Sequence, residues 1–286
     1  MKITKAFLLF FFITAGLSLK AQNRQKEMLN LGYVWNPNGY FSALDAKAAY
    51  QFFKYPSGAW SASLSVREAD LELNKVNSSL HLKNYRLSLP FVSRLSPAWM
   101  SIVSPSVSVR NSSHSMVIED QSLFYSGFLL ATYREPRPDT KWSWSIGAIY
   151  SREIEKNFFL PIVSANYMSP PIRLNLGFPN LSLLYQVKPS WEIGLKVNYD
   201  SSTYALSDSE PIGKSLYPGF RLRIIDIGPA FNFRVDKHIW VNTNLGVVAL
   251  AEGQTVSARG SSKDLVYRGD NSIFMRVSLS YYPVLQ

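Results

Sequence analysis

A period-two alternation of apolar and polar residues is the feature that most restricts how this chain can fold. In the segment 191–200 every odd position is apolar or aromatic, and every even position is polar, charged or glycine. Segments 60–67 and 142–150 repeat the pattern, with Ile149 as the exception, and the C-terminal run 273–281 sets Arg276, Ser278 and Ser280 against an apolar face. Successive side chains of a strand point to opposite faces of a sheet. The pattern therefore predicts an all-β protein whose strands each present one apolar face.

Two kinds of connector separate the predicted strands. Short connectors carry turn-forming residues at 55–58, 95–97, 136–139, 188–190 and 236–238, and longer polar connectors lie near 111–121, 205–218 and 257–271. After residue 22 the chain has no apolar run of about 18 residues, so no membrane-spanning helix is predicted there. This asymmetry is typical of a transmembrane β-barrel, which has tight turns at one end and longer loops at the other.

The tryptophans provide a separate indication of a membrane barrel. Five of the seven follow a short connector closely, namely Trp60, Trp99, Trp142, Trp191 and Trp240. An indole at the same end of each hairpin builds a belt at the membrane interface. The alternative is a soluble β-sandwich in which the tryptophans pack at strand ends, but repeated placement after the same kind of turn favours the membrane.

The number of strands depends on two segments. The candidate strands are 42–55, 60–73, 80–93, 99–110, 122–134, 142–152, 159–168, 172–187, 191–204, 219–233, 240–256 and 269–283. The run 29–35 can add one strand, and the segment 172–187 can split at 177–180, because proline is poorly tolerated inside a ladder. We therefore predict a transmembrane antiparallel up-and-down β-barrel of about 12 to 14 strands, since single-chain bacterial barrels have even strand numbers.

The first residues have the composition of an export signal. Residues 1–21 combine Lys2 and Lys5 with an apolar stretch and end at Ala21, which predicts a signal peptide followed by a barrel domain over 22–286. An uncleaved anchor is the alternative, although the apolar stretch is short for a spanning helix. Export places the predicted barrel in the bacterial outer membrane. Its expected partners are outer-membrane lipid and, during biogenesis, the barrel-assembly machinery, but not nucleic acid, despite a formal net charge of +10.

Candidate chemistry is sparse along the chain. There is no cysteine, which excludes disulfides, thiolate metal sites and a cysteine nucleophile. Of the three histidines, His114 falls in a predicted loop, His81 in a strand and His238 in a turn, and none has the His-x-Ser pattern of barrel lipases and deacylases. The acidic residues at 119–120 and 207–210 lack the spacing of a calcium loop. We therefore expect neither catalytic residues, nor a metal, nor a cofactor.

Strand parity assigns charged residues to the barrel interior. An arginine or lysine on the lipid face costs about 2–4 kcal/mol at mid-membrane, so charge is expected inside. If Trp191, Phe220 and Ile273 point to lipid, the residues that face the lumen are Arg67, Glu192, Lys196, Asp200, Arg221, Arg223 and Arg276. Such an interior fits an anion-selective pore, and it fits equally an interior plugged by mutually neutralising ion pairs.

One short motif resembles a known family. The residues Leu174-Asn175-Leu176-Gly177-Phe178-Pro179, followed by the apolar run 181–185, resemble uncharacterised outer-membrane barrels of the Bacteroidota type, defined as a domain of unknown function. The signal ending at 20–22 is also similar to that group. The resemblance implies a barrel and an outer-membrane location, and it implies no catalytic residues.

These observations favour a pore or passive channel for a small polar or anionic solute. The alternative is a non-conducting structural barrel that binds a partner through loops such as 111–121 and 205–218. A barrel enzyme acting on lipid is the third hypothesis.

Overall fold

The computed structural model describes residues 28–36, 41–73, 78–112, 122–135, 141–153, 156–206, 218–256, 262–268 and 272–283. The strands of the first half are β1 (Leu29–Trp35), β2 (Phe41–Tyr55), β3 (Gly58–Leu73), β4 (Ser78–Ser88), β5 (Phe91–Arg94), β6 (Trp99–Asn111), β7 (Leu123–Arg134) and β8 (Trp142–Glu153). Those of the second half are β9 (Lys156–Ser169), β10 (Ile172–Gly177), β11 (Asn180–Lys188), β12 (Trp191–Ala205), β13 (Gly219–Arg234), β14 (Ile239–Val256), β15 (Ser262–Arg268) and β16 (Ser272–Tyr281). No helix among the described residues is long and apolar enough to cross a membrane.

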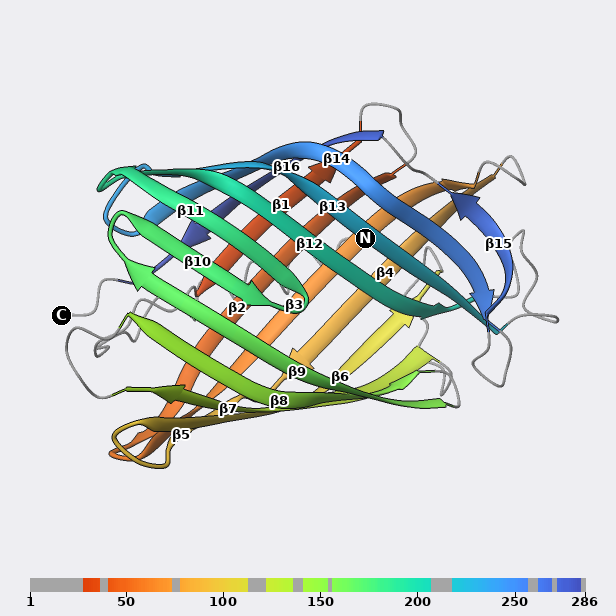
Figure 1. Ribbon diagram of the computed structural model, residues 1–286. Helices are drawn as coiled ribbons and strands as arrows, with labels where there is room; N and C mark the ends of the chain where they lie inside the picture. Colours follow the sequence, from red (N-terminus) through yellow and green to blue (C-terminus); the bar gives the residue numbers. More distant parts are fainter. Residues whose placement is uncertain are drawn as a thin grey trace.

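The strands form one antiparallel sheet that closes on itself (Figure 1). Neighbours in sequence pair with one another around the wall, and β1 pairs with β16 to close it. Segments β4 and β5 both pair with β3 and β6, so they form one interrupted strand. Segments β15 and β16 also form one interrupted strand. Both pair with β14 in the same register, since Arg268 is opposite Glu252 and Ser272 is opposite Val248. The sixteen segments therefore make a closed 14-stranded β-barrel, which confirms the predicted fold class.

The two segments that left the strand number open both add a strand, which gives fourteen strands. The run 29–35 is strand β1, and the segment 172–187 divides into β10 and β11 at residues 178–179. Two predicted boundaries are wrong. The segment 80–93 is interrupted at Leu89–Pro90, because a proline cannot donate to the ladder. The loop predicted at 257–271 contains β15, which extends the last strand beyond the expected start at 269.

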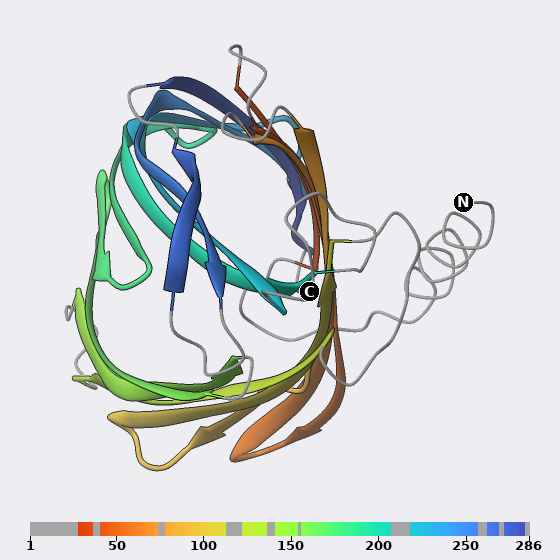
Figure 2. The ribbon, with the colours of Figure 1, turned by 90° about the vertical axis from the view of Figure 1, so that its right-hand side faces the viewer.

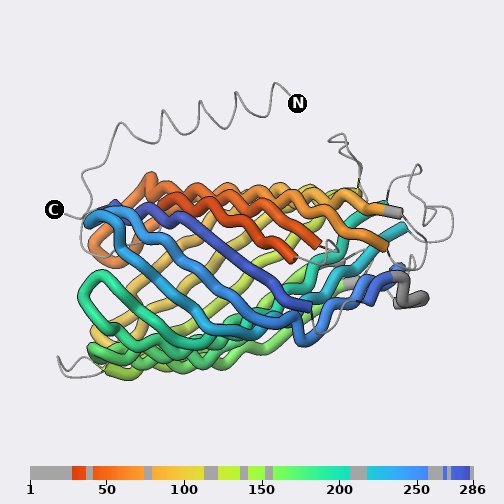
Figure 3. The backbone as a smooth tube through the Cα atoms, turned by 90° about the horizontal axis from the view of Figure 1, so that it is seen from above, coloured from red at the N-terminus to blue at the C-terminus, as the bar shows by residue number. Residues whose placement is uncertain are grey.

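The two ends of the barrel differ. The short connectors between β2 and β3, β5 and β6, β9 and β10, and β11 and β12 all lie at one end, here called the turn end. The opposite end, here called the loop end, has the connector that leaves β12 at Ala205. The strands run obliquely to the barrel axis, as the view from above shows (Figure 3). Strands β13 and β14 contain 16 and 18 residues and are among the longest of the barrel.

Side-chain polarity inverts along the strands that project at the loop end. Nearer the turn end, the outer face is apolar and the inner face is polar, as the odd and even residues of β12 show. Toward the loop end of β13, the outer face bears Arg221 and Arg223, while Phe220 and Leu222 are buried inside. Strand β3 changes in the same way, from Val66 on the outside to Leu71 on the inside.

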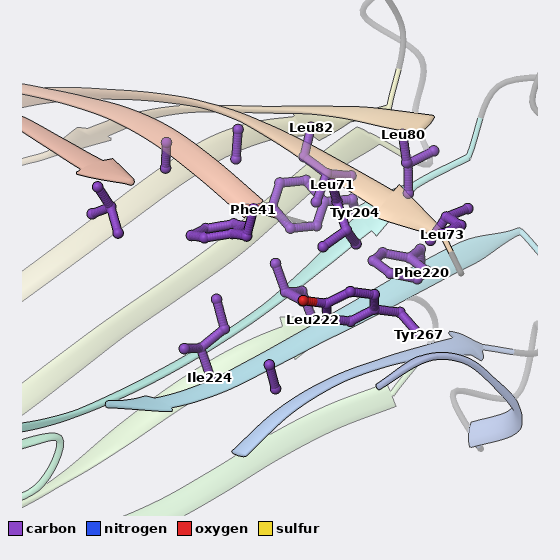
Figure 4. Close-up of a cluster of buried hydrophobic side chains, with 14 of the residues drawn as sticks. Phe41, Leu71, Leu73, Leu80, Leu82, Tyr204, Phe220, Leu222, Ile224 and Tyr267 are labelled. Atoms are coloured by element: carbon purple, nitrogen blue, oxygen red, sulfur yellow. The ribbon is translucent and has the colours of Figure 1, made fainter. Parts of the chain in front are cut away.

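The inward apolar side chains at the loop end form one cluster between opposite walls (Figure 4). It joins β1, β2, β3 and β4 to β12, β13, β14, β15 and β16. Its residues are Val34, Phe41, Ala43, Ala69, Leu71, Leu73, Leu80, Leu82, Tyr204, Leu206, Phe220, Leu222, Ile224, Val248, Ala251, Tyr267 and Phe274. We call it the apolar cluster. Opposite walls of the barrel thus share a hydrophobic core at this end.

A backbone contact also crosses the barrel at the loop end. The end of β12 lies against the end of β6, where Ala205 pairs with Asn111 in parallel and the Ser112 N–H donates to the Ala205 carbonyl at 3.0 Å. The end view shows β12 and β13 crossing toward β4 and β6, so the ring is constricted (Figure 2). The constriction divides this end into the half filled by the apolar cluster and a second half whose wall is β6–β11.

Candidate functional site: the barrel lumen

An ion-pair network spans the lumen next to the apolar cluster. Arg67 lies near the middle of β3, and its partner Asp45 is directly opposite on β2, with Nε and Oδ1 at 3.5 Å. Arg67 also donates through Nη1 to Asp200, which belongs to β12 on the facing wall. Because β3 and β12 are not neighbours in the sheet, this second pair ties opposite sides of the barrel together.

A second ion pair continues the network toward β16. Arg276 donates through Nη2 to Oδ2 of Asp226 at 2.9 Å, and the Asn198 amide donates to the other oxygen of that carboxylate at 2.5 Å. The Asp226 side chain is almost fully buried. A buried carboxylate is stable only with such partners, since an unpaired buried charge is strongly destabilising.

Beside the network the lumen contains a cavity of about 350 Å³. We call it the lumen cavity. Its charged lining consists of the cations Lys47, Arg67 and Arg86 and the carboxylates Asp45 and Asp200, which leaves one excess positive charge. Its neutral polar lining comprises Asn30, Ser65, Asn84, Ser201 and Ser202.

Arg86 is a cation of this lining with an unpartnered donor. Its Nε atom is buried and has no hydrogen-bond partner among the described residues, and the Oδ1 atom of the adjacent Asn84 is in the same state. Buried polar groups in proteins normally have partners. An unsatisfied guanidinium donor in a cavity with excess positive charge is suited to an acceptor-bearing anion.

A third set of polar contacts lies nearer the turn end. Arg173 on β10 donates through Nη1 to Glu192 on β12 at 2.7 Å, and the Asn232 amide donates to the same carboxylate at 2.8 Å. The arginine side chain is about half exposed, while the carboxylate is buried. This end of the lumen is thus polar and accessible to solvent on the Arg173 side.

The structure places five of the predicted lumen residues on the inner face. Arg67, Asp200 and Arg276 belong to the network described above, and Glu192 and Lys196 share the inner parity of β12.

Arg221 and Arg223 correct the prediction. They share the outer parity of Ile227, whereas Phe220, which was assumed to face lipid, is fully buried inside. The assumption failed because alternation separates the two faces of β13 without showing which of them is inside the barrel.

The sequence prediction missed Asp45, Lys47, Arg86, Arg173 and Asp226. Only Asp226 has a sequence signal, because it is the one charged residue in the run 224–233. The others became visible only through the register of β2, β4 and β10 with their neighbours.

The predicted tryptophan belt is also changed at one position. Trp60, Trp99, Trp142 and Trp191 lie on the outer face near the turn end. Trp240 is opposite Ser280, an inner residue, so it faces the lumen side and does not belong to the belt. Its ring lies 5.9 Å from the Arg234 guanidinium carbon, close enough for a cation–π contact.

The histidines and acidic loop residues add no chemistry to the described part of the chain. His81 bonds to Asp70 at 2.6 Å on the outer face, and Nδ1 of His238 lies 3.0 Å from the Tyr282 carbonyl. His114, residues 119–120 and residues 207–210 lie outside the described residues. Within the described ranges, no group of three or more metal-ligating side chains is present.

The fold belongs to the class of closed antiparallel barrels, and its structural neighbours are outer-membrane β-barrels. The NanC porin is 8% identical with a TM-score of 0.45, covering 88% of this chain and 98% of that chain. LpxR from Salmonella typhimurium is 6% identical with a TM-score of 0.41, covering 89% and 99%. The Pseudomonas putida toluene transporter TodX is 9% identical with a TM-score of 0.38, covering 89% and 88%. The sequence matches no protein-family model and no curated protein, so its resemblance to a Bacteroidota-type family stays a prediction. At these identities the likeness concerns the fold alone.

Proposed function

We propose that this chain is an outer-membrane β-barrel that works as a narrow passive passage for small polar or weakly anionic solutes. The observation that carries the proposal is the lumen cavity of about 350 Å³ with one excess positive charge in its lining. A pore whose interior carries excess positive charge concentrates anions, particularly at low ionic strength. The proposal includes the membrane location and assigns no catalytic step to the chain.

The outer surface supports the membrane location. Large apolar side chains are exposed on the outward face of most strands, among them Leu31, Leu129, Ile146, Val163, Leu183, Leu195, Phe231 and Ile273. A continuous exposed apolar surface of this kind is unfavourable in water and is expected where a barrel meets lipid.

At the loop end the proposed route uses the half of the lumen walled by β6–β11, and nearer the turn end it passes the lumen cavity, whose lining belongs to β1–β4 and β12. The other half is filled at the loop end by the apolar cluster, which leaves no polar path there among the described residues. In the β6–β11 half the inner face is rich in small hydroxyl side chains, such as Ser106, Ser126 and Ser143. Phe128 also points inward on β7 and is still 38% exposed, so solvent reaches this part of the wall.

Ion flow across planar bilayers tests the proposal. We expect the purified full-length protein to conduct and its reversal potential in a KCl gradient to show a preference for chloride. Replacing the cavity guanidinium in Arg86→Ser removes the excess positive charge, so the chloride preference is expected to disappear. The matched control is Arg223→Ser on the outer face, which should leave selectivity unchanged.

Two results would refute this function: no conductance from correctly folded protein, or equal changes in selectivity for Arg86→Ser and Arg223→Ser. Solute uptake into liposomes measures the same passage without an applied voltage.

The second candidate is a non-conducting barrel that binds a partner. The apolar cluster and the contact of β12 with β6 favour it, because both narrow the loop end. Folded protein that stays silent in bilayers and co-purifies with a defined partner would support this second function over the first.

A further inference from the structure

Among the described residues, the wall of the barrel is incomplete beyond the hairpin of β10 and β11, toward the loop end. These two strands have only 6 and 9 residues, whereas the flanking β9 and β12 have 14 and 15. Pairing of β9 with β10 ends at Ser164 and Gly177, and pairing of β11 with β12 ends at Asn180 and Asn198. Beyond these points, residues 156–163 of β9 pair only with β8 among the described strands.

The size of this interruption follows from sheet geometry. Two strands are missing between β9 and β12, so three interstrand spacings of about 4.8 Å leave about 14 Å between the strand axes if the circumference is kept. The upper part of β12 does not close the distance, because its end turns inward to β6. Figure 1 shows that the β10–β11 hairpin ends while β9 and β12 continue toward the loop end. We call this interruption the lateral opening.

The unpaired edge of β9 has a proline at a position whose backbone N–H would otherwise be exposed. The Met168 N–H donates to the Lys141 carbonyl, so even-numbered residues of β9 direct their backbone groups toward β8. Odd-numbered residues therefore point to the opposite side, and Pro161 falls on the lateral opening. Proline has no N–H, and each unsatisfied backbone group facing lipid costs several kcal/mol. Pro161 removes one such donor from the opening.

Strand β9 is apolar on both faces where it borders the opening. Its run Phe158–Val163 contains no polar side chain. Phe159 and Val163 point outward and are each 68% exposed, while Leu160 and Ile162 point inward. An apolar surface therefore continues from the lipid side, around the unpaired edge, into the lumen.

The inward apolar residues continue as a stripe across three strands. Leu160 is opposite Ile149, which is opposite Phe128, and the next row toward the turn end contains Ile162, Gly147 and Leu130. We call Phe128, Leu130, Ile149, Leu160 and Ile162 the inner apolar stripe. Hydroxyl side chains border it on both sides. Ser126 and Ser151 lie on one side, in a row whose β9 member is Phe158, and Thr132, Ser145 and Ser164 lie on the other.

We propose that the lateral opening admits the acyl chain of an anionic amphiphile from the surrounding membrane to the inner apolar stripe. The hydrocarbon chain follows the continuous apolar surface of β9. On the other rim of the opening, Asp200 and Ser202 of β12 line the lumen cavity, whose excess positive charge and unpartnered Arg86 Nε suit an anionic head. This passage is lateral, so it does not depend on conduction along the barrel axis.

Fluorescence quenching in vesicles tests the proposal. Because the chain has no cysteine, single-cysteine variants can carry a bimane label at chosen positions. The test variant is Leu160→Cys on the stripe, the inner control is Ser106→Cys on β6, and the lipid-facing control is Val163→Cys. The vesicles contain phosphatidylcholine and a fatty acid that bears a nitroxide on its chain.

We expect the fatty acid to quench the label at position 160 several-fold more strongly than the label at position 106, and to approach the quenching at position 163. Adding Ile149→Ser to the Leu160→Cys variant should reduce the quenching, because a hydroxyl interrupts the stripe. Folding of every variant is checked by heat-modifiable migration on gels. Quenching at position 160 no greater than at position 106 overturns the proposal, as would occur if a strand of another copy filled the opening.

Discussion

Replacing Phe220 with alanine tests the inverted polarity of the loop end. The Phe220 side chain is fully buried in the apolar cluster between opposite walls. Truncating a buried phenylalanine costs about 3–5 kcal/mol, from the lost transfer free energy and the cavity that remains. With a urea dependence of about 1–3 kcal/mol per molar, the unfolding midpoint is expected to fall by about 2 M.

The assay is urea unfolding in detergent, followed by the loss of the heat-modifiable gel form. The matched variant is Arg223→Ala, three residues away on the outer face of the same strand. Arg223 is partly exposed and lies outside the apolar cluster, so its midpoint should change much less than that of Phe220→Ala.

The reversed orientation of β13 predicts the reverse effects of these two substitutions. If Phe220 faced lipid and Arg223 faced the lumen, Arg223→Ala would alter ion selectivity, and Phe220→Ala would leave no internal cavity. A midpoint for Phe220→Ala equal to that of Arg223→Ala would refute the inverted arrangement. Bilayer recordings on both variants provide the second measurement, and only Phe220→Ala is expected to raise conductance by loosening the filled half.

Three further perturbations address packing, charge and the open edge. Gly253→Ala should lower the free energy of unfolding by about 1–3 kcal/mol through overpacking, since an added Cβ would lie 2.4 Å from the Phe220 ring, and urea midpoints measure this. Arg276→Met leaves the buried Asp226 carboxylate without its cation and should cost about 3–5 kcal/mol, whereas adding Asp226→Leu should recover most of the loss in the same unfolding assay. Pro161→Val restores a backbone donor at the lateral opening and should increase self-association, detected by cross-linking in detergent; unchanged association would contradict the assignment of Pro161 to a free edge.

The strand pattern was predictable because alternation is a local property. Wherever one face of a strand meets lipid, as at 191–200, period two appears in the sequence and the residue parity follows from it. The break at 177–180 was also predictable, since Pro179 is unsuited to a ladder interior. The same reasoning missed the interruption at Pro90, where one strand resumes in the same pairing after two residues.

The site was less predictable, because it depends on which face of each strand is inside the barrel. Parity alone places Phe220 and Arg221 on opposite faces but does not say which face is inside. The polarity of the inward face changes along β13, from Asn232 to Phe220, and no local signal in the strand marks the point. Strand β14 also has a bulge opposite Ile225 and Asp226. The extra residue shifts the alternation of inward and outward side chains, so that Ala251 points into the apolar cluster. Cross-lumen pairs such as Arg67 with Asp200 depend on the closure of the whole barrel.

A short turn links the strand number to the lateral opening. Residues 177–180 end β10 after six residues, so the chain makes two additional strands that are too short to complete the wall. Without the β10–β11 hairpin, the barrel would have had twelve strands, and β9 could have paired with β12 along its length. The edge of β9 would then have been covered, and the apolar residues on its outer and inner faces would not have formed one continuous surface. The short hairpin leaves the edge of β9 unpaired, and Pro161 removes a backbone donor from that same edge. The turn and the proline therefore fit the same unpaired edge, although 16 positions separate Pro161 from Gly177. This agreement between two distant local features indicates that the opening belongs to the folded barrel.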